Sequence, residues 1–155
     1  MIRGLAHGGR VLGRPDYVNA AARAADALLE GMSTRDGGVL RASRDGQASI
    51  NGFLEDYAFL ARGLLALHQA TGDERWMLEA IELTEAARDR FWGDDGAWFD
   101  TMADQEDLLV RSRNLGDGAV PSGIGTMLLV LLELAELTED QTYLVDLESA
   151  MTRLS

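Results

Sequence analysis

The chain has 155 residues, 46% of them hydrophobic, and a formal net charge of −12 at pH 7, which fits one soluble globular domain with a hydrophobic core. It contains no cysteine and, although it has 14 basic residues, no lysine, so disulfides, thiolate metal sites, lysine Schiff bases and Walker-type phosphate loops are excluded. The negative charge argues against nucleic acid and anionic membranes as partners, and no apolar run reaches the roughly 18 residues of a membrane span.

Three short, mostly acidic turns recur along the chain, each directly before an aromatic residue and a segment with helical spacing of apolar residues. They lie at 13–17, 71–76 and 138–143. Recurrence on this scale predicts a stacked two-helix unit. An aspartate in each turn can cap the next helix, and the spacing of Thr71 and Glu74, or of Thr138 and Gln141, fits a capping box.

The segments on the two sides of each turn differ in kind. Residues 53–70 and 124–137 are apolar on nearly every side, which predicts helices buried on more than one face. Residues 16–30, 76–91 and 143–154 carry apolar side chains along one face, with polar or charged residues opposite. The chain therefore repeats inner helix, turn and outer helix three times, and its first residues already belong to the first inner helix.

Two long connections, 31–52 and 93–121, each run from an outer helix to the next inner helix and so lie at the same end of the array. Asp45-Gly46 between two alternating segments predicts a β-hairpin in the first connection. Residues 98–99 and 108–110 suggest a second hairpin in the other. Loops of this length in a compact domain are usually functional.

These elements predict an all-α fold: three inner/outer helical hairpins that form half of an (α/α)6 toroid, with one or two small β-hairpins in the long connections. We expect residues 1–155 to form one such domain, and to be only part of a ring. An open half ring leaves apolar inner helices exposed, which is rare on soluble monomers. Either a second copy closes the ring as a homodimer, or the chain is a piece of a longer one.

Several motifs resemble those of a known family. They are the GFLEDYAFL stretch at 52–60 with 63–65 and 71–73, DGAVPSG at 117–123, and the aromatic pairs at 91–92 and 98–99 followed by Asp100. Together they are similar to the C-terminal region of YyaL-type thioredoxin domain-containing proteins. The resemblance implies a six-hairpin, glycosidase-like toroid similar to that of N-acylglucosamine 2-epimerases and cellobiose epimerases. The thioredoxin-like part and the first half of the toroid are outside this sequence, and Ile124 stands where the family often has asparagine.

The first turns of the inner helices hold the candidate catalytic carboxylates. Inner helices of a toroid begin at one mouth, so polar residues in their first turns would line a cavity there. Asp56, whose neighbours at helical spacing are apolar, and Asp117 are our candidates for the acid and base that glycosidic chemistry needs. The structural alternative is that such residues satisfy free backbone N–H groups and the helix dipole.

Other residues at this mouth are candidates for binding a ligand: Asn51, Glu55, Tyr57, Trp98, Arg111, Arg113 and Ser122. Trp98 is the aromatic residue best placed to stack on a sugar ring. Arg111 and Arg113 can bind an anionic sugar, or they can pair with local acids such as Asp104, Glu106 and Asp107.

The sequence supports no metal site and no cofactor. His7 and His68 are poor candidates for the acid–base histidines that the epimerase resemblance implies, because neither is placed at the mouth. We predict a cytoplasmic, carbohydrate-active or carbohydrate-binding toroid domain of undefined reaction, with a sugar as ligand. The alternative is a non-catalytic helical module that binds a ligand or a protein partner.

Overall fold

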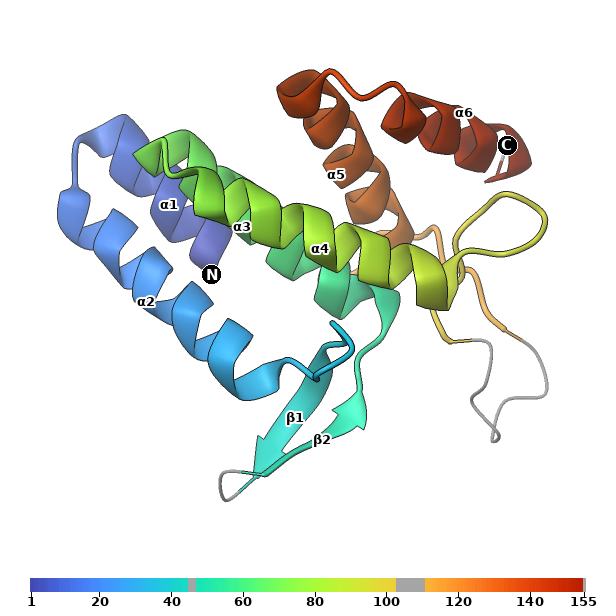
Figure 1. Cartoon of the computed structure of the whole chain (residues 1–155), viewed down its shortest axis with the longest axis horizontal. Helices are drawn as coiled ribbons and strands as arrows, with labels where there is room; N and C mark the ends of the chain where they lie inside the picture. Colours follow the sequence, from blue (N-terminus) through green and yellow to red (C-terminus); the bar gives the residue numbers. More distant parts are fainter. Residues whose placement is uncertain (45–46, 103–110, 155) are drawn as a thin grey trace. The chain divides into compact units, whose positions relative to one another are not determined.

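The computed structural model describes residues 1–44, 47–102 and 111–154, and within them the chain forms six α-helices and one two-stranded antiparallel sheet (Figure 1). The elements are α1 (Ile2–Leu12), α2 (Pro15–Met32), β1 (Leu40–Arg44), β2 (Gln47–Asn51), α3 (Leu54–Thr71), α4 (Glu74–Phe91), α5 (Gly123–Thr138) and α6 (Thr142–Leu154). The predicted all-α class and the order of the helices are confirmed. The second predicted hairpin joins residues 98–99 to 108–110, and of these 108–110 lie outside the described residues.

The chain divides into two compact units, and both α3 and α4 contribute to each of them. The first unit comprises Met1–Gly52 and Leu60–Leu83, and the second comprises Phe53–Phe59 and Thr84–Ser155.

In the first unit, α1 and α2 form a closely packed hairpin (Figure 1). Gly13 ends α1 with a φ of 64°, a left-handed conformation that glycine adopts without strain. Pro15 then occupies the start of α2, where its missing N–H costs nothing. A Cβ at Gly9 would lie 2.9 Å from the Arg14 carbonyl oxygen and 3.0 Å from the Val18 nitrogen, so the absence of a side chain allows this close packing.

The predicted β-hairpin follows α2. Strand β1 pairs with β2 so that Leu40 lies opposite Asn51 and Arg44 opposite Gln47. The Gly52 N–H donates to the Val39 carbonyl at 2.8 Å, which extends the hairpin to the residues before α3. The turn residues Asp45 and Gly46 are not among the described ones.

The turns after α3 and α5 are built in the same way, which explains the repeat seen in the sequence. Thr71 and Thr138 are the last helical residues, and each hydroxyl donates to the carbonyl four residues earlier. The next residue takes a positive φ, and the following aspartate accepts the N–H of the residue two positions later. The two predicted capping boxes, Thr71–Glu74 and Thr138–Gln141, are therefore wrong. Asp73 caps α4 and Asp140 caps α6, because α3 continues through Thr71 and α5 through Thr138.

Burial separates the inner from the outer helices as the sequence predicts. Helices α3 and α5 carry most of the fully buried large side chains, which include Leu54, Tyr57, Leu64, Leu65, Leu67, Ile124, Met127, Val130, Leu131 and Leu134. Helix α2 buries only Ala21 and Ala25.

In the second unit, aromatic side chains join the start of α3 and the end of α4 to the connection that follows. The Tyr57 and Phe91 rings meet edge to face with centroids 5.2 Å apart, and Trp92 and Trp98 do so at 5.0 Å. Edge-to-face contacts of this kind add stability beyond the area they bury. They fix the connection after Phe91 next to the first turn of α3.

Candidate functional site

Helices α3 and α5 touch at their first residues, as predicted for two neighbouring inner helices. A Cβ at Gly123 would lie 2.9 Å from the Glu55 backbone nitrogen and 3.0 Å from its Cα. Glycine is therefore the residue that lets the two helix starts approach this closely. Ser122 caps α5, because its Oγ accepts the Gly125 N–H at 2.8 Å.

The connection between α4 and α5 is tied to the same place by backbone hydrogen bonds. The Leu54 N–H donates to the Asp100 carbonyl at 3.0 Å, and the Asp100 N–H donates to the Ser112 carbonyl at 2.9 Å. Further bonds fix the Asp100 side chain, whose Oδ2 accepts the Asn114 N–H at 2.6 Å and the Ser112 hydroxyl at 3.3 Å. Asp100 thus links three chain segments.

An open cavity of about 440 Å³ lies between these segments, and we refer to it as the α3–α5 cavity. Its lining residues are Phe53, Glu55, Asp100, Thr101, Ser112, Asn114, Gly116, Gly118, Val120, Pro121, Ser122 and Gly123. Two carboxyl groups, three hydroxyls and an amide are the side-chain polar groups in this set. None of these described lining residues carries a positive charge.

The partly buried environment of Asp100 shifts the pKa of its carboxyl group. Burial raises the pKa of the Asp100 carboxyl, the hydrogen bonds from Asn114 and Ser112 oppose the rise, and the negative charge of Glu55 adds to it. A carboxyl group shifted in this direction holds its proton to higher pH, so it can donate as well as accept a hydrogen bond.

Thr101 also lines this cavity, and its hydroxyl is buried. The residue is 8% exposed, and its Oγ1 has no hydrogen-bond partner within the described part of the chain. Its carbonyl oxygen, in contrast, accepts two bonds from Arg111, from Nε at 3.0 Å and from Nη2 at 2.9 Å.

The two predicted catalytic carboxylates lie beside the cavity, where each holds a helix start. Asp56 Oδ2 accepts the Phe53 N–H at 2.8 Å, across the first turn of α3. Asp117 Oδ1 accepts the Ser122 N–H at 2.9 Å, directly before α5. The structure brings Glu55 and Ser122 to the cavity lining, but neither Asp56 nor Asp117.

The two predicted ligand-binding arginines hold the connection in place. Arg111 donates to the Thr101 and Arg90 carbonyls and lies 4.1 Å from the Phe99 ring centroid. Burial lowers the Arg111 pKa. Arg113 lies on the same Phe99 ring at 3.7 Å and forms a two-bond ion pair with Asp95 at 2.8 and 2.6 Å.

Asp104, Glu106 and Asp107, the acids that the sequence offered as partners of these arginines, lie outside the described residues. The pairing seen for Arg113 uses Asp95, which also accepts from Arg153 at 3.0 Å. The guanidinium groups hold the Asp95 pKa far below its usual range.

The remaining predicted ligand-binding residues do not line this cavity. Trp98 is fully buried and Tyr57 is 1% exposed, so neither ring offers a surface for a sugar in this structure. Asn51 is exposed and lies at the end of β2, in the first unit. His68 lies in α3, where its Nδ1 donates to the Asp73 carbonyl at 3.1 Å.

Sequence reasoning missed Asp100, Thr101, Ser112 and Asn114 as site residues. Each of them has a hydrogen-bond partner ten or more positions away, as in the Asp100–Asn114 bond, and no periodicity reports such a contact. The aromatic pair Trp98-Phe99 directly before Asp100 is the one local signal, since buried aromatic residues fix the chain beside them.

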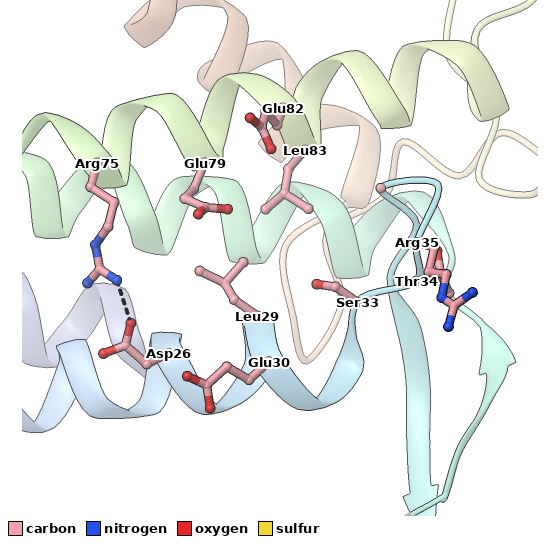
Figure 2. A pocket seen from close by; sticks show the side chains of 11 residues that line it. Asp26, Leu29, Glu30, Ser33, Thr34, Arg35, Arg75, Glu79, Glu82 and Leu83 are labelled. Carbon is pink, nitrogen blue, oxygen red and sulfur yellow. Dashed lines mark hydrogen bonds and ion pairs between the residues drawn. The ribbon is translucent and has the colours of Figure 1, made fainter.

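The first unit has a cavity of its own, between α2 and the first half of α4, also of about 440 Å³ (Figure 2). Asp26 accepts from Arg75 at 3.0 Å on one side of it, and Glu30, Glu79 and Glu82 add three further carboxylates.

Across residues 1–44, 47–102 and 111–154 no group of three or more histidine, aspartate or glutamate side chains is arranged to hold a metal ion. No helix among these residues is long and apolar enough to cross a membrane.

The chain is similar in sequence to much longer proteins, although no protein-family model matches it. It is 34% identical over 149 residues to spermatogenesis-associated protein 20 of Rattus norvegicus, a match that covers 89% of this chain and 19% of that protein. The Homo sapiens protein of the same name is 33% identical over 79% of this chain, and an uncharacterized Caenorhabditis elegans protein is 30% identical over 82%. The chain spans about a fifth of the length of the curated relatives it matches.

A solved structure shows the fold. The GH76 α-mannanase of Bacteroides thetaiotaomicron matches 94% of this chain and 36% of its own with a TM-score of 0.72 and 16% sequence identity. That enzyme is an α/α toroid. The predicted inner/outer hairpins of a toroid are thereby confirmed for this chain.

Proposed function

We propose that this chain forms a carbohydrate-binding part of an α/α-toroid domain, with the sugar in the α3–α5 cavity. The observation that carries the proposal is the cavity itself. It has room for a sugar ring, and it is lined by carboxyl, hydroxyl and amide groups from the starts of α3 and α5 and from the connection between α4 and α5. A concave site with a small number of convergent polar groups is typical of small-molecule recognition.

The comparisons support the choice of ligand class. The solved toroid that shares this fold is named an α-mannanase, so α-mannose and its oligosaccharides are the first ligands to test. The resemblance in sequence and the similarity to spermatogenesis-associated protein 20 also lead us to propose that the chain corresponds to a toroid segment of a YyaL-type thioredoxin domain-containing protein. Whether that larger protein hydrolyses or isomerises a sugar stays open.

Glu55 and Asp100 are the two carboxyl groups that a ligand in this cavity would meet. Asp56 and Asp117, our first candidates, contribute by holding the first turns of α3 and α5. In this proposal a hydroxyl group of the ligand donates to Glu55, as expected for sugar recognition by carboxylates.

Isothermal titration of the full chain with α-mannosides tests the proposal, with Glu55→Gln as the site variant and Glu79→Gln as the matched control. Glu79 lines the cavity of the first unit, so its variant should bind as the wild type does. Loss of a charged hydrogen-bond acceptor should weaken binding by Glu55→Gln about tenfold or more. Equal binding by Glu55→Gln, or no binding by the wild type, would refute it.

We also propose that the chain self-associates as a homodimer. Leu129, Leu132 and Leu137 of α5 are 44%, 40% and 37% exposed, which is unusual for an inner helix. Since the net charge of −12 opposes association, the dimer should tighten as salt screens that charge. Light scattering at rising salt that shows only monomer would contradict this.

A further inference from the structure

Helix α1 carries a stripe of basic side chains on its exposed face. Arg3, His7 and Arg10 are exposed and follow one another at intervals of four and three residues, so they share one face of the helix. None of the three forms a hydrogen bond or an ion pair with another described residue. We refer to these three residues as the α1 stripe.

Unpaired arginines are unexpected in a chain of this charge. Acids outnumber arginines 26 to 14 over the whole sequence, yet residues 1–25 hold four arginines and a single acid, Asp16. Asp16 already pairs with Arg14 at 2.7 Å. The segment that contains α1 therefore has no acid of its own left to pair with the α1 stripe.

The surface next to the α1 stripe is open to the close approach of another helix. A Cβ at Gly4 or Gly8 would meet nothing within 4 Å, so packing within the chain gives no reason for either glycine, although glycine inside a helix is destabilising relative to alanine. Val11, directly after Arg10, is 65% exposed. Small and apolar residues bordered by charged ones suit a contact that is packed at its centre and ionic at its rim.

Helix α4 carries a stripe of the opposite charge. Glu82, Glu85 and Asp89 are exposed, follow one another at intervals of three and four residues, and form no hydrogen bond or ion pair with another described residue. We refer to them as the α4 stripe. Leu78, about one turn before Glu82, is 55% exposed. The exposed face of α4 thus combines carboxylates with an apolar side chain, as the face of α1 combines basic groups with Val11.

The two stripes match when the helices run in opposite directions. The intervals are four then three along the α1 stripe, and three then four along the α4 stripe, so in an antiparallel pair each arginine would meet a carboxylate and the histidine would meet Glu85. Val11 and Leu78 would then lie at the same end of the contact. In a parallel pair the intervals differ, and these two apolar side chains would lie at opposite ends.

We propose that α1 of one copy of this chain docks antiparallel on α4 of a second copy, with the α1 stripe paired to the α4 stripe. This inference rests on the proposed self-association and adds a contact that determines which faces meet. The same contact made in the other direction closes the pair as a two-fold dimer. Paired charges in a contact are screened less than the long-range repulsion between two copies, so the dimer still tightens as salt rises.

Charge reversal on α1 is the first test, by sedimentation equilibrium of the full chain at about 0.15 M salt. The variant combines Arg3→Glu with Arg10→Glu. Its matched control combines Arg23→Glu with Arg35→Glu, which makes the same change in net charge at two exposed arginines outside α1.

Charge reversal on α4 is the second test, with Glu82→Arg combined with Asp89→Arg. Each of these reversals adds two positive charges, so the net charge changes from −12 to −8. Because a smaller net charge weakens the general repulsion between copies, an effect of net charge alone would make this variant dimerise more tightly than the wild type. The proposed contact predicts the opposite.

We expect each reversed variant to dimerise at least about tenfold more weakly than the wild type, and the control to dimerise more tightly than the α1 variant it matches. An equal mixture of the α1 and α4 variants should dimerise more tightly than either variant alone. In the mixed pair the reversed α1 meets the reversed α4, and the unchanged α1 meets the unchanged α4. Recovery in the mixture also shows that both variants are folded.

The outcomes separate this contact from self-association in general. If the wild type dimerises and the reversed variants dimerise equally well, or if the mixture is no tighter than its two variants alone, this inference is overturned and the proposed self-association stands. If the wild type stays monomeric at every concentration, both are overturned.

Discussion

The contact between Gly123 and the first turn of α3 allows a quantitative test of how the cavity is built. In Gly123→Ala the new Cβ would lie 2.9 Å from the Glu55 nitrogen and 3.0 Å from its Cα, whereas ordinary van der Waals contact begins at 3.4 Å. The atoms it meets are the Glu55 nitrogen, Cα and Cβ, which move only with the backbone, so no side-chain rotation can relieve the contact. The starts of α3 and α5 must separate by about 0.5 Å.

The expected cost follows from two opposing effects. Overpacking of this kind costs about 1–3 kcal/mol, and alanine recovers up to about 1 kcal/mol of helix propensity relative to glycine. The net loss of about 1–2 kcal/mol corresponds to a fall in Tm of about 2–8 °C for a chain of this length. Separation would also weaken mannoside binding, because Glu55 and Ser122 line the cavity on either side of the contact.

Gly8→Ala provides the control for this experiment. Gly8 lies within α1, and a Cβ there would meet nothing within 4 Å, so that variant should gain about 0.4–1 kcal/mol in unfolding free energy. Differential scanning calorimetry of both variants measures the difference. A Gly123→Ala protein as stable as Gly8→Ala would refute the close approach of the two helix starts.

Three further outcomes are expected. Arg88→Met should lower the unfolding free energy at neutral pH by about 1–3 kcal/mol, since it leaves the buried Asp146 carboxylate without its ion pair at 2.7 Å. Burial raises the pKa of Asp146, although the positive charge of Arg88 lowers it. The variant should therefore recover unfolding free energy as the Asp146 carboxyl takes up its proton at lower pH. Urea titrations from pH 7 to pH 4 measure this recovery. The pKa of Asp100 is also raised in the folded state. The unfolding free energy of the wild type should therefore rise relative to that of Asp100→Asn as the pH falls from about 7 toward about 4. This rise should be complete below about 3.9, the pKa of an aspartate in the unfolded chain. Asp56→Ala, which removes the acceptor of the Phe53 N–H, should cost about 1 kcal/mol in a chemical melt.

The helices could be predicted because their causes are local. Apolar spacing placed the two inner helices at 53–70 and 124–137, and they run from Leu54 to Thr71 and from Gly123 to Thr138. The cap of α4 was wrongly assigned because a threonine before a glycine serves equally well as the last residue of one helix or the cap of the next. The hydroxyl of Thr71 bonds back to Leu67, and only the structure reveals that direction.

The sequence predicts a cavity where the inner helices begin, but most of the residues that line the observed cavity could not be predicted. The mouth of the inner helices was expected from the direction of the helices, and Glu55 and Ser122 were among its expected residues. The part played by Asp100 depends on bonds to Ser112 and Asn114, which join positions that no periodicity connects. Arg111 and Arg113 were offered as anion binders because their charge is visible in the sequence, while their carbonyl partners are not.

The neighbours Glu55 and Asp56 show how a step of one residue along a helix separates a side chain that lines the cavity from one that holds the helix start. Successive residues of an α-helix differ in direction by about 100°, so the two carboxylates cannot face the same partner. Asp56, three residues after Phe53, faces back along the turn and accepts the Phe53 N–H that the helix leaves free. Glu55, one position earlier, is thereby left on the face that meets Gly123 and the cavity. Apolar neighbours at helical spacing favoured Asp56 in the sequence because they indicate shielding. A shielded carboxylate at the third position of a helix is, however, the one that backbone N–H groups attract most strongly, and its neighbour Glu55 is the one that lines the cavity.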